Sequence, residues 1–300
     1  MYLDHFKLKA LPFLLTPNVE FYCQLKSHQE ALNTLLFCLH SGEGFIKIVG
    51  EVGSGKTLLC RKLLGCLEEK FFTAYIPNPD LDPLELRKAF ARELGLSPGV
   101  HDQHELLSMI NHRLIELHTS GKRVVLLLDE AQAIPLESLE AIRLLTNLET
   151  ESTKLLQVVL FGQPELDEHL NQPHFRQLKQ RITFSYYLSL LTRQETDLYL
   201  FHRLAVAGHT YGSLFTEKAR KALFKASNGV PRIINILCHK SLLIAFGRGE
   251  RVITYQMLQM AIQDTEVAVI SQNSSLVVFL LSGLVLLMML CGFLYVRGLI

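Results

Sequence analysis

The chain has 300 residues, with 30 Lys and Arg against 29 Asp and Glu, which leaves a formal net charge of +1 when the 12 His are counted as neutral. This balance excludes a protein that holds nucleic acid through a global basic field, and the length allows one or two cores without disulfides or structural metals. The six Cys form no CxxC pair, so we interpret them as small, reduced hydrophobic residues.

The first two thirds of the chain alternate between predicted strands and helices. A lead-in helix is expected within residues 1–40, where apolar residues recur at helical spacing behind Ser27. Short β-rich runs predict strands at 45–49, 73–76, 124–128, 156–161 and 182–188. Helical patterns lie between them at 57–68, 83–95, 104–119 and 136–149. The alternation predicts an α/β core over residues 41–190, with a parallel sheet covered by helices on both faces.

The last third of the chain predicts helices alone. Helical segments near 193–207, 216–227, 231–246 and 254–265 indicate an all-α lid subdomain over residues 191–267. A polar linker is expected at 268–275. Residues 276–296 are apolar and would span roughly 31 Å as a helix, which predicts one transmembrane helix followed by a short tail at 297–300. Because the N-terminus shows no signal-peptide pattern, we expect residues 1–267 in the cytoplasm.

Residues 50–57 fit the pattern GxxxxGK[ST] between a predicted strand and a predicted helix. In such a phosphate loop, backbone N–H groups surround the phosphates, Lys56 reaches the β- and γ-phosphates, and the Thr57 hydroxyl coordinates Mg²⁺. The alternative, a glycine-rich turn with a surface lysine, does not account for this context. The residues expected to contact the nucleotide are Gly50, Glu51, Val52, Gly53, Ser54, Gly55, Lys56, Thr57 and Leu58.

Two adjacent carboxylates follow the apolar run 124–128. Since a buried parallel strand ends at the sheet edge where ligands bind, we expect Asp129 to hold Mg²⁺ through water and Glu130 to orient or deprotonate the attacking water. A simple helix N-cap is the alternative for these residues.

Four further polar residues are candidates for the site. Gln163 follows a predicted strand and could touch the γ-phosphate or the water, although it could equally be a turn residue before a helix that begins at a proline. Arg176 and Arg181 are candidates for an arginine finger that reaches a neighbouring subunit's nucleotide, and solvated arginines are the alternative. Arg232 starts a predicted lid helix, from which its guanidinium could point back at the phosphates.

These motifs resemble the AAA+ ATPases of the general secretion pathway protein A (ExeA) family, and most of all its shorter branch that serves MSHA pilus biogenesis (MshM). The resemblance covers about residues 1–267. It rests on Pro12-Phe13 and on residues 1–6, 44–57, 128–132, 161–166 and 180–182. It implies sensor 1 at Gln163, an arginine finger at Arg181, sensor 2 at Arg232, and a ring or dimer whose subunits share sites. Secretion members continue into a peptidoglycan-binding region that this sequence lacks, so we expect the pilus branch.

We therefore expect a single-pass protein of the bacterial inner membrane whose cytoplasmic AAA+ domain hydrolyses ATP, with Mg²⁺, to support biogenesis of a type IV pilus of the MSHA kind. A type II secretion ATPase for secretin assembly is the nearest alternative. The expected partners are further copies of the chain and inner-membrane pilus or secretion assembly proteins. A DNA-binding ATPase of the transposition or initiator type shares the core, but the neutral charge and the apolar segment argue against nucleic acid. A non-hydrolysing scaffold is disfavoured by Asp129 and Glu130.

Overall fold

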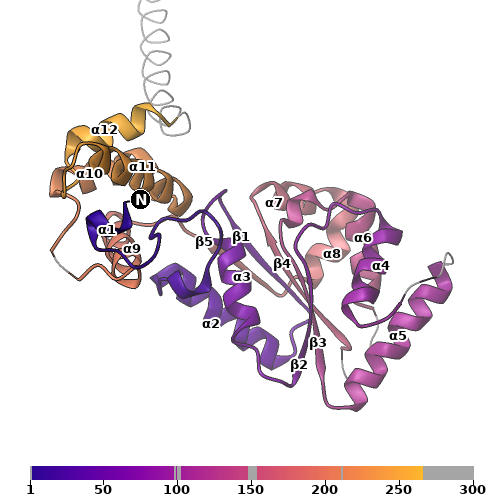
Figure 1. The fold of residues 1–300 in the computed structure, drawn as a ribbon. Helices are drawn as coiled ribbons and strands as arrows, with labels where there is room; N and C mark the ends of the chain where they lie inside the picture. The colour runs from indigo at the N-terminus through magenta and orange to yellow at the C-terminus, as the bar shows by residue number, and fades with distance from the viewer. Residues whose placement is uncertain (1, 98, 100–102, 148–153, 211, 266–300) are drawn as a thin grey trace, which may run out of the picture. The chain divides into compact units, whose positions relative to one another are not determined.

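The computed structural model describes residues 2–97, 99, 103–147, 154–210 and 212–265 (Figure 1). Its internal contacts divide it into two compact units. The first, which we call the core unit, runs from Thr16 to Leu190, and the second, the helical unit, combines the described residues before Thr16 with those after Leu190. The region that the sequence groups as a lead-in at 1–40 is thus shared between the two units, because its first residues pack on helices from the end of the chain.

The core unit is built on one five-stranded sheet. Its strands are β1 (Phe45–Gly50), β2 (Phe71–Ile76), β3 (Arg123–Leu128), β4 (Leu156–Gly162) and β5 (Phe184–Leu188). Their order is β2-β3-β4-β1-β5, and every neighbouring pair is parallel. All five lie within two residues of the runs predicted from sequence. Parallel pairing brings the carboxyl ends of the strands to the same edge, which is where the segments after β1, β3 and β4 begin.

Helices cover both faces of the sheet, as the alternating pattern predicts (Figure 1). One face carries α2 (Lys26–Ser41) and α3 (Lys56–Leu64). The other carries α4 (Pro83–Glu93), α5 (Gln103–Thr119), α6 (Leu136–Leu145), α7 (Glu165–Leu170) and α8 (Arg176–Arg181). Side chains of β3 alternate between the two cores, with Leu126 in the second and Leu127 in the first, and both are fully buried. Because both faces are covered, the inner strands β1, β3 and β4 consist mostly of apolar runs, whereas residues of the edge strand β5 alternate between half-buried and exposed.

One charged side chain interrupts the central strand β1. Lys47 is buried and forms an ion pair with Asp167 of α7. The pair joins the strand that leads into the phosphate loop to the helix that follows Gln163. Its contribution is mainly the avoidance of an unpaired buried charge.

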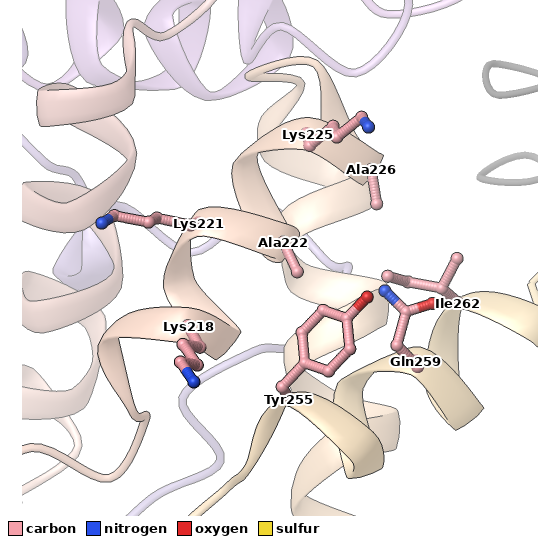
Figure 2. Close-up of a pocket in the computed structure, with 8 residues that line it drawn as sticks. All are labelled: Lys218, Lys221, Ala222, Lys225, Ala226, Tyr255, Gln259 and Ile262. Carbon is pink, nitrogen blue, oxygen red and sulfur yellow. The ribbon is translucent and has the colours of Figure 1, made fainter.

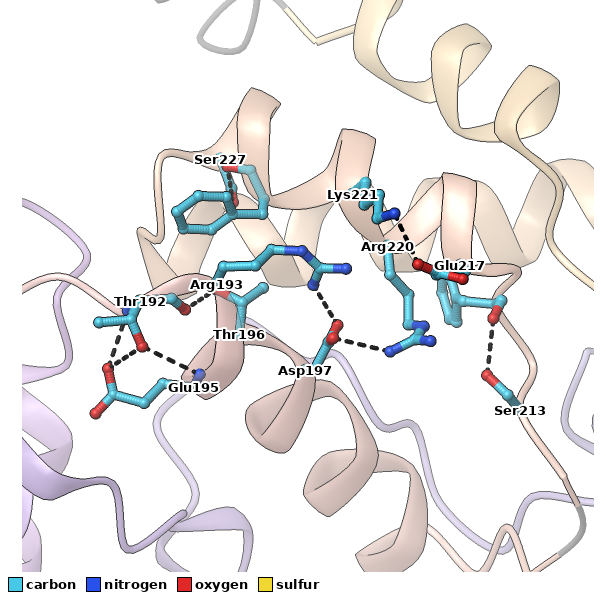
Figure 3. Close-up of polar contacts among 12 residues, drawn as sticks. Thr192, Arg193, Glu195, Thr196, Asp197, Ser213, Glu217, Arg220, Lys221 and Ser227 are labelled. Atoms are coloured by element: carbon cyan, nitrogen blue, oxygen red, sulfur yellow. Dashed lines mark hydrogen bonds and ion pairs between the residues drawn. The ribbon is translucent and has the colours of Figure 1, made fainter.

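The helical unit contains α1 (Leu3–Phe6), α9 (Arg193–Val206), α10 (Glu217–Ser227), α11 (Pro231–Gly247) and α12 (Tyr255–Gln263). A groove opens between α10 and α12 (Figure 2). Helix α9 begins with a capping box, in which Thr192 and Glu195 each bond the other's backbone N–H. Asp197 of α9 accepts from Arg193 at 2.5 Å and from Arg220 of α10 at 2.8 Å, which ties these two helices together (Figure 3).

The predicted linker at 268–275, the predicted transmembrane helix at 276–296 and the tail at 297–300 all lie outside the described residues. Among the helices that the structure does describe, none combines the length and the apolar character needed to cross a membrane.

Candidate nucleotide-binding site

The phosphate loop joins the end of β1 at Gly50 to the start of α3 at Lys56. Gly53 and Gly55 adopt φ of +78° and +105°, a left-handed region that glycine enters without strain. At Gly50 the constraint is space, since a Cβ there would lie 2.9 Å from Ser54 Oγ and 3.0 Å from Leu188 Cβ. The glycines therefore allow the backbone to wrap tightly at the beginning of α3, where N–H groups are left for a phosphate.

Lys56 lies inside this loop. Its Nζ donates to the carbonyl oxygens of Gly50 at 2.7 Å and Glu51 at 3.0 Å, and the side chain is buried. Burial lowers the pKa of the Lys56 ammonium, against the opposing influence of the carboxylates of Glu130 and Asp129. A phosphate group would offer this buried cation the negative charge that offsets its desolvation.

His28 supports the loop from α2. Its Nε2 donates to the carbonyl oxygen of Ser54 at 2.9 Å. A Cβ at Gly55 would lie 2.9 Å from the same nitrogen, so His28 fills the space that this glycine leaves open. His28 could not be predicted from the sequence, because no local pattern relates a helix residue to a loop 26 positions later.

Asp129 lies directly after β3 and is buried. Its backbone N–H donates to the carbonyl oxygen of Ile76 at 3.1 Å, and its carboxylate accepts from the N–H of Glu130 at 3.0 Å. The Thr57 side chain lies beside the same carboxylate. Burial raises the pKa of the Asp129 carboxyl, and the neighbouring Thr57 side chain and the N–H of Glu130 oppose the rise. The structure thus brings together Thr57 and Asp129, the two residues predicted to hold Mg²⁺.

The donor set of Thr57 and Asp129 fits Mg²⁺. Both offer hard oxygen atoms, and within the described part of the chain no three His, Cys, Asp or Glu residues are grouped to hold a metal by themselves. An ion bound here would need oxygen atoms from a phosphate and from water, and this mixed coordination is the one that Mg²⁺ favours.

Glu130 is held by two amide side chains. Its Oε2 accepts from Gln132 Nε2 at 2.6 Å and from Gln163 Nε2 at 3.1 Å, and Gln132 Oε1 accepts from the N–H of Gln163 at 3.0 Å. Glu130 itself has φ of +51°, a left-handed conformation that is uncommon outside glycine and is often found at functional sites. The ends of β3 and β4 are therefore linked through one carboxylate.

Gln132 is a site residue that the sequence analysis does not single out. It lies in η2 (Ala131–Ala133), two residues after Glu130, and only the left-handed turn at Glu130 brings the two side chains together. A polar residue shortly after a strand-end carboxylate is the one available indication, and it is too general to assign a role.

The two candidate arginines of the core unit are not brought to the phosphate loop by any contact in the described residues. Arg181 Nη1 donates to Thr146 Oγ1 at 2.9 Å, next to the end of α6. Arg176 is exposed at the start of α8. Arg232 is exposed in the first turn of α11, in the helical unit.

The structural neighbours show the fold. Cdc6p from Pyrobaculum aerophilum superimposes with a TM-score of 0.67 at 20% identity, over 84% of this chain and 70% of that one. The ORC1 protein of Aeropyrum pernix, solved in complex with DNA, gives a TM-score of 0.61 at 19% identity, over 84% of this chain and 69% of that one. At these identities the likeness extends to the α/β nucleotide-binding fold and its helical unit only.

Sequence comparison is more specific. The profile of the AAA domain matches residues 39–170. General secretion pathway protein A of Aeromonas hydrophila is 43% identical over 262 residues, which are 87% of this chain and 48% of that protein. This chain therefore spans about half the length of its curated relative. Together the two matches confirm the resemblance predicted from the motifs, and the chain is an AAA+ protein related to general secretion pathway protein A.

Proposed function

We propose that the chain hydrolyses ATP to ADP and phosphate at the site formed by the phosphate loop, Asp129 and Glu130. The observation that carries this proposal is the placement of Glu130. Its carboxylate is fixed by Gln132 and Gln163 at the same sheet edge as the Thr57–Asp129 pair. A base fixed beside a metal-binding pair is what hydrolysis needs, whereas binding alone does not require it.

In this reaction the backbone N–H groups of the loop and Lys56 bind the phosphates of ATP. Thr57 and Asp129 would hold Mg²⁺, which when bound neutralises charge that builds on the β- and γ-phosphates. Glu130 accepts a proton from the water that attacks the γ-phosphorus as the bond to the bridging oxygen breaks. Gln163 orients that water or the γ-phosphate, which is the sensor 1 role. The nucleotide-contacting set is the one predicted from sequence, residues 50–58.

We also propose that subunits share sites in a ring or dimer. Arg232 would contact the nucleotide as sensor 2, and Arg181 would act as the arginine finger. Since Arg181 is bonded to Thr146, it would have to leave this contact to reach a neighbour, while Arg176 is already exposed. Arg176 therefore remains the alternative finger.

For the cellular role, we propose that the chain supports a secretion machine or a type IV pilus machine of the MSHA kind at the bacterial inner membrane. The ATPase core would comprise residues 41–190, the lid residues 191–267, and the membrane anchor residues 276–296. The likeness to general secretion pathway protein A supports the secretion link, and the uncharged apolar run supports the anchor. Removing residues 272–300 should release a folded, ATP-binding protein into the soluble fraction. Retention of the truncated protein in membranes would refute the anchor.

The enzymatic proposal is tested with Lys56→Ala, Glu130→Gln and, as a control lysine at the opposite end of β3, Lys122→Ala. We expect Lys56→Ala to lose ATP binding, and Glu130→Gln to bind ATP but release phosphate at least about tenfold more slowly. The Lys122→Ala protein should match the wild type. Equal ATP binding by wild type and Lys56→Ala in a fluorescence assay would remove the phosphate-loop assignment.

A further inference from the structure

The groove between α10 and α12 lies within the helical unit and is separate from the phosphate loop in sequence. Its cavity has a volume of about 460 Å³. The residues that line it are Lys218, Lys221, Ala222, Lys225, Ala226, Tyr255, Gln259 and Ile262 (Figure 2). None of these eight is acidic, so the groove has a cationic lining.

The positive charge comes from one face of α10. Lys218, Lys221 and Lys225 follow one another at spacings of three and four residues, which places them along the same side of a helix, and all three are exposed. Lys221 has a partner in Glu217 at 2.7 Å, but both side chains are 66% exposed, and such pairs are weak in water. In the described part of the chain, Lys218 and Lys225 form no ion pair.

Two carboxylates of the unit are already paired with other cations. Asp197 lies between Arg193 and Arg220, so this carboxylate is already occupied by two guanidinium groups (Figure 3). Asp264 likewise pairs with Lys240 at 2.8 Å. The charges of Lys218 and Lys225 are therefore left for a partner outside this unit.

The floor of the groove is apolar. Ala222 is partly exposed, whereas Ala226 and Ile262 are buried and close the bottom of the groove, and Figure 2 shows Ala222 pointing toward the Tyr255 ring. Tyr255 is 48% exposed, although an aromatic ring gains free energy when it is covered. Alanines at positions 222 and 226 create the hollow, because a longer side chain would fill it.

We propose that this groove is a docking site for an acidic amphipathic helix of a partner protein. Apolar side chains on one face of that helix would pack on the alanines and Tyr255, while carboxylates beside them would pair with Lys218 and Lys225. The two lysines are seven residues apart on α10, about 10 Å along its axis, which matches carboxylates two turns apart on a helix lying alongside.

The shape of the site favours this occupant over two others. A flat membrane of anionic lipid would meet the lysine tips but would leave the apolar floor uncovered. A nucleic-acid backbone would satisfy the charges but has no apolar face for the floor. The proposal concerns a partner and does not depend on ATP hydrolysis.

The probe is a synthetic, fluorescein-labelled helical peptide with Glu along one face and Leu beside it, titrated with the full-length protein in detergent and followed by anisotropy. The groove variants are Lys218→Glu with Lys225→Glu, and separately Ala222→Trp, which fills the hollow and keeps every charge. The matched control, Lys122→Glu with Lys154→Glu, makes the same change of charge at the amino ends of β3 and β4.

We expect both groove variants to weaken peptide binding at least tenfold, and the control to change it less than twofold. Thermal midpoints close to that of the wild type would show that the groove variants remain folded, and a peptide with Lys in place of Glu should not bind. The proposal is overturned if the peptide binds the wild type and both groove variants equally, or not at all. It is also overturned if binding of phosphatidylglycerol vesicles or duplex DNA depends on Lys218 and Lys225 but binding of the peptide does not depend on them.

Discussion

Gln132 Nε2 lies 2.6 Å from Glu130 Oε2, closer than any other hydrogen-bond donor described at that carboxylate. The same amide group accepts the backbone N–H of Gln163 through its oxygen atom. Gln132 thus fixes the proposed base and the proposed sensor relative to one another.

Replacing Gln132 by Ala should slow ATP turnover by about 10- to 150-fold, because a hydrogen bond to a charged group contributes roughly 1.5–3 kcal/mol and Glu130 loses one of its two donors. ATP binding should stay within twofold of the wild type, since Gln132 does not belong to the loop. Phosphate release and nucleotide titration measure the two effects. The half-buried Gln29 of α2, whose side chain donates to Asn33, provides the control as Gln29→Ala, and wild-type turnover in Gln132→Ala would contradict the positioning role.

Replacing Arg181 by Ala tests two roles at once, because the side chain also bonds Thr146. As an arginine finger it should lower turnover by about 10³-fold and leave ATP binding intact. Thr146→Val removes the internal hydrogen bond but keeps the guanidinium, so it should lower the thermal midpoint without a comparable loss of turnover. Mixtures of Arg181→Ala with Glu130→Gln subunits should regain activity if sites are shared. A failure to recover on mixing would count against a finger in trans.

Asp129→Asn should stabilise the nucleotide-free protein at neutral pH. Burial raises the pKa of the Asp129 carboxyl in the folded state, so its ionised form costs stability once the pH exceeds the pKa of the unfolded chain. The midpoint should rise by about 2–4 °C, the shift that about 1 kcal/mol produces in a protein of this size. As the pH falls through the raised pKa, the wild-type carboxyl takes up a proton, so the difference in thermal midpoint between the variant and the wild type should shrink. Thermal unfolding of both proteins from pH 8 downward measures this difference, and a difference that stays constant at every pH would refute the explanation.

The Lys47–Asp167 pair should respond unequally to loss of each partner. Asp167→Asn leaves the buried ammonium of Lys47 without its counter-charge and should cost about 1–3 kcal/mol, below the usual range for a buried pair because the Asp167 side chain is 43% exposed. Lys47→Met removes the charge and retains similar volume, so it should cost less than about 1 kcal/mol. Urea unfolding of the two variants and the double variant gives the coupling. Equal losses from both single changes would argue against this account.

The sequence predicts the parts of the fold that local patterns determine. The glycines and Lys56 specify a strand, loop and helix within a dozen residues, and apolar runs mark the inner strands β1, β3 and β4 because both of their faces are buried. Asp129 and Glu130 could be placed at the sheet edge for the same reason, since any strand of a parallel sheet ends there.

Side-chain partners between separate elements could not be predicted in this way. The bond of Arg181 to Thr146 depends on where α6 ends relative to α8, and the Gln132 network depends on one left-handed residue. Likewise, the lysines of α10 look like an ordinary solvated face until α12 is placed beside them and the hollow between the two helices becomes visible.

The helical unit is made from both ends of the described chain, and this affects the order in which the protein can fold during synthesis. Lys9 donates its backbone N–H to Ala207 at 2.7 Å, and the guanidinium of Arg203 bonds the carbonyl oxygen of Pro12. At about 5–20 residues per second, the ribosome needs roughly 10–40 s to reach residue 200. Throughout that interval Phe6 and Phe13, both buried in the finished protein, have no packing partners from the later helices. The contiguous core unit can therefore acquire its phosphate loop while the segment made before it remains open to chaperones and proteases.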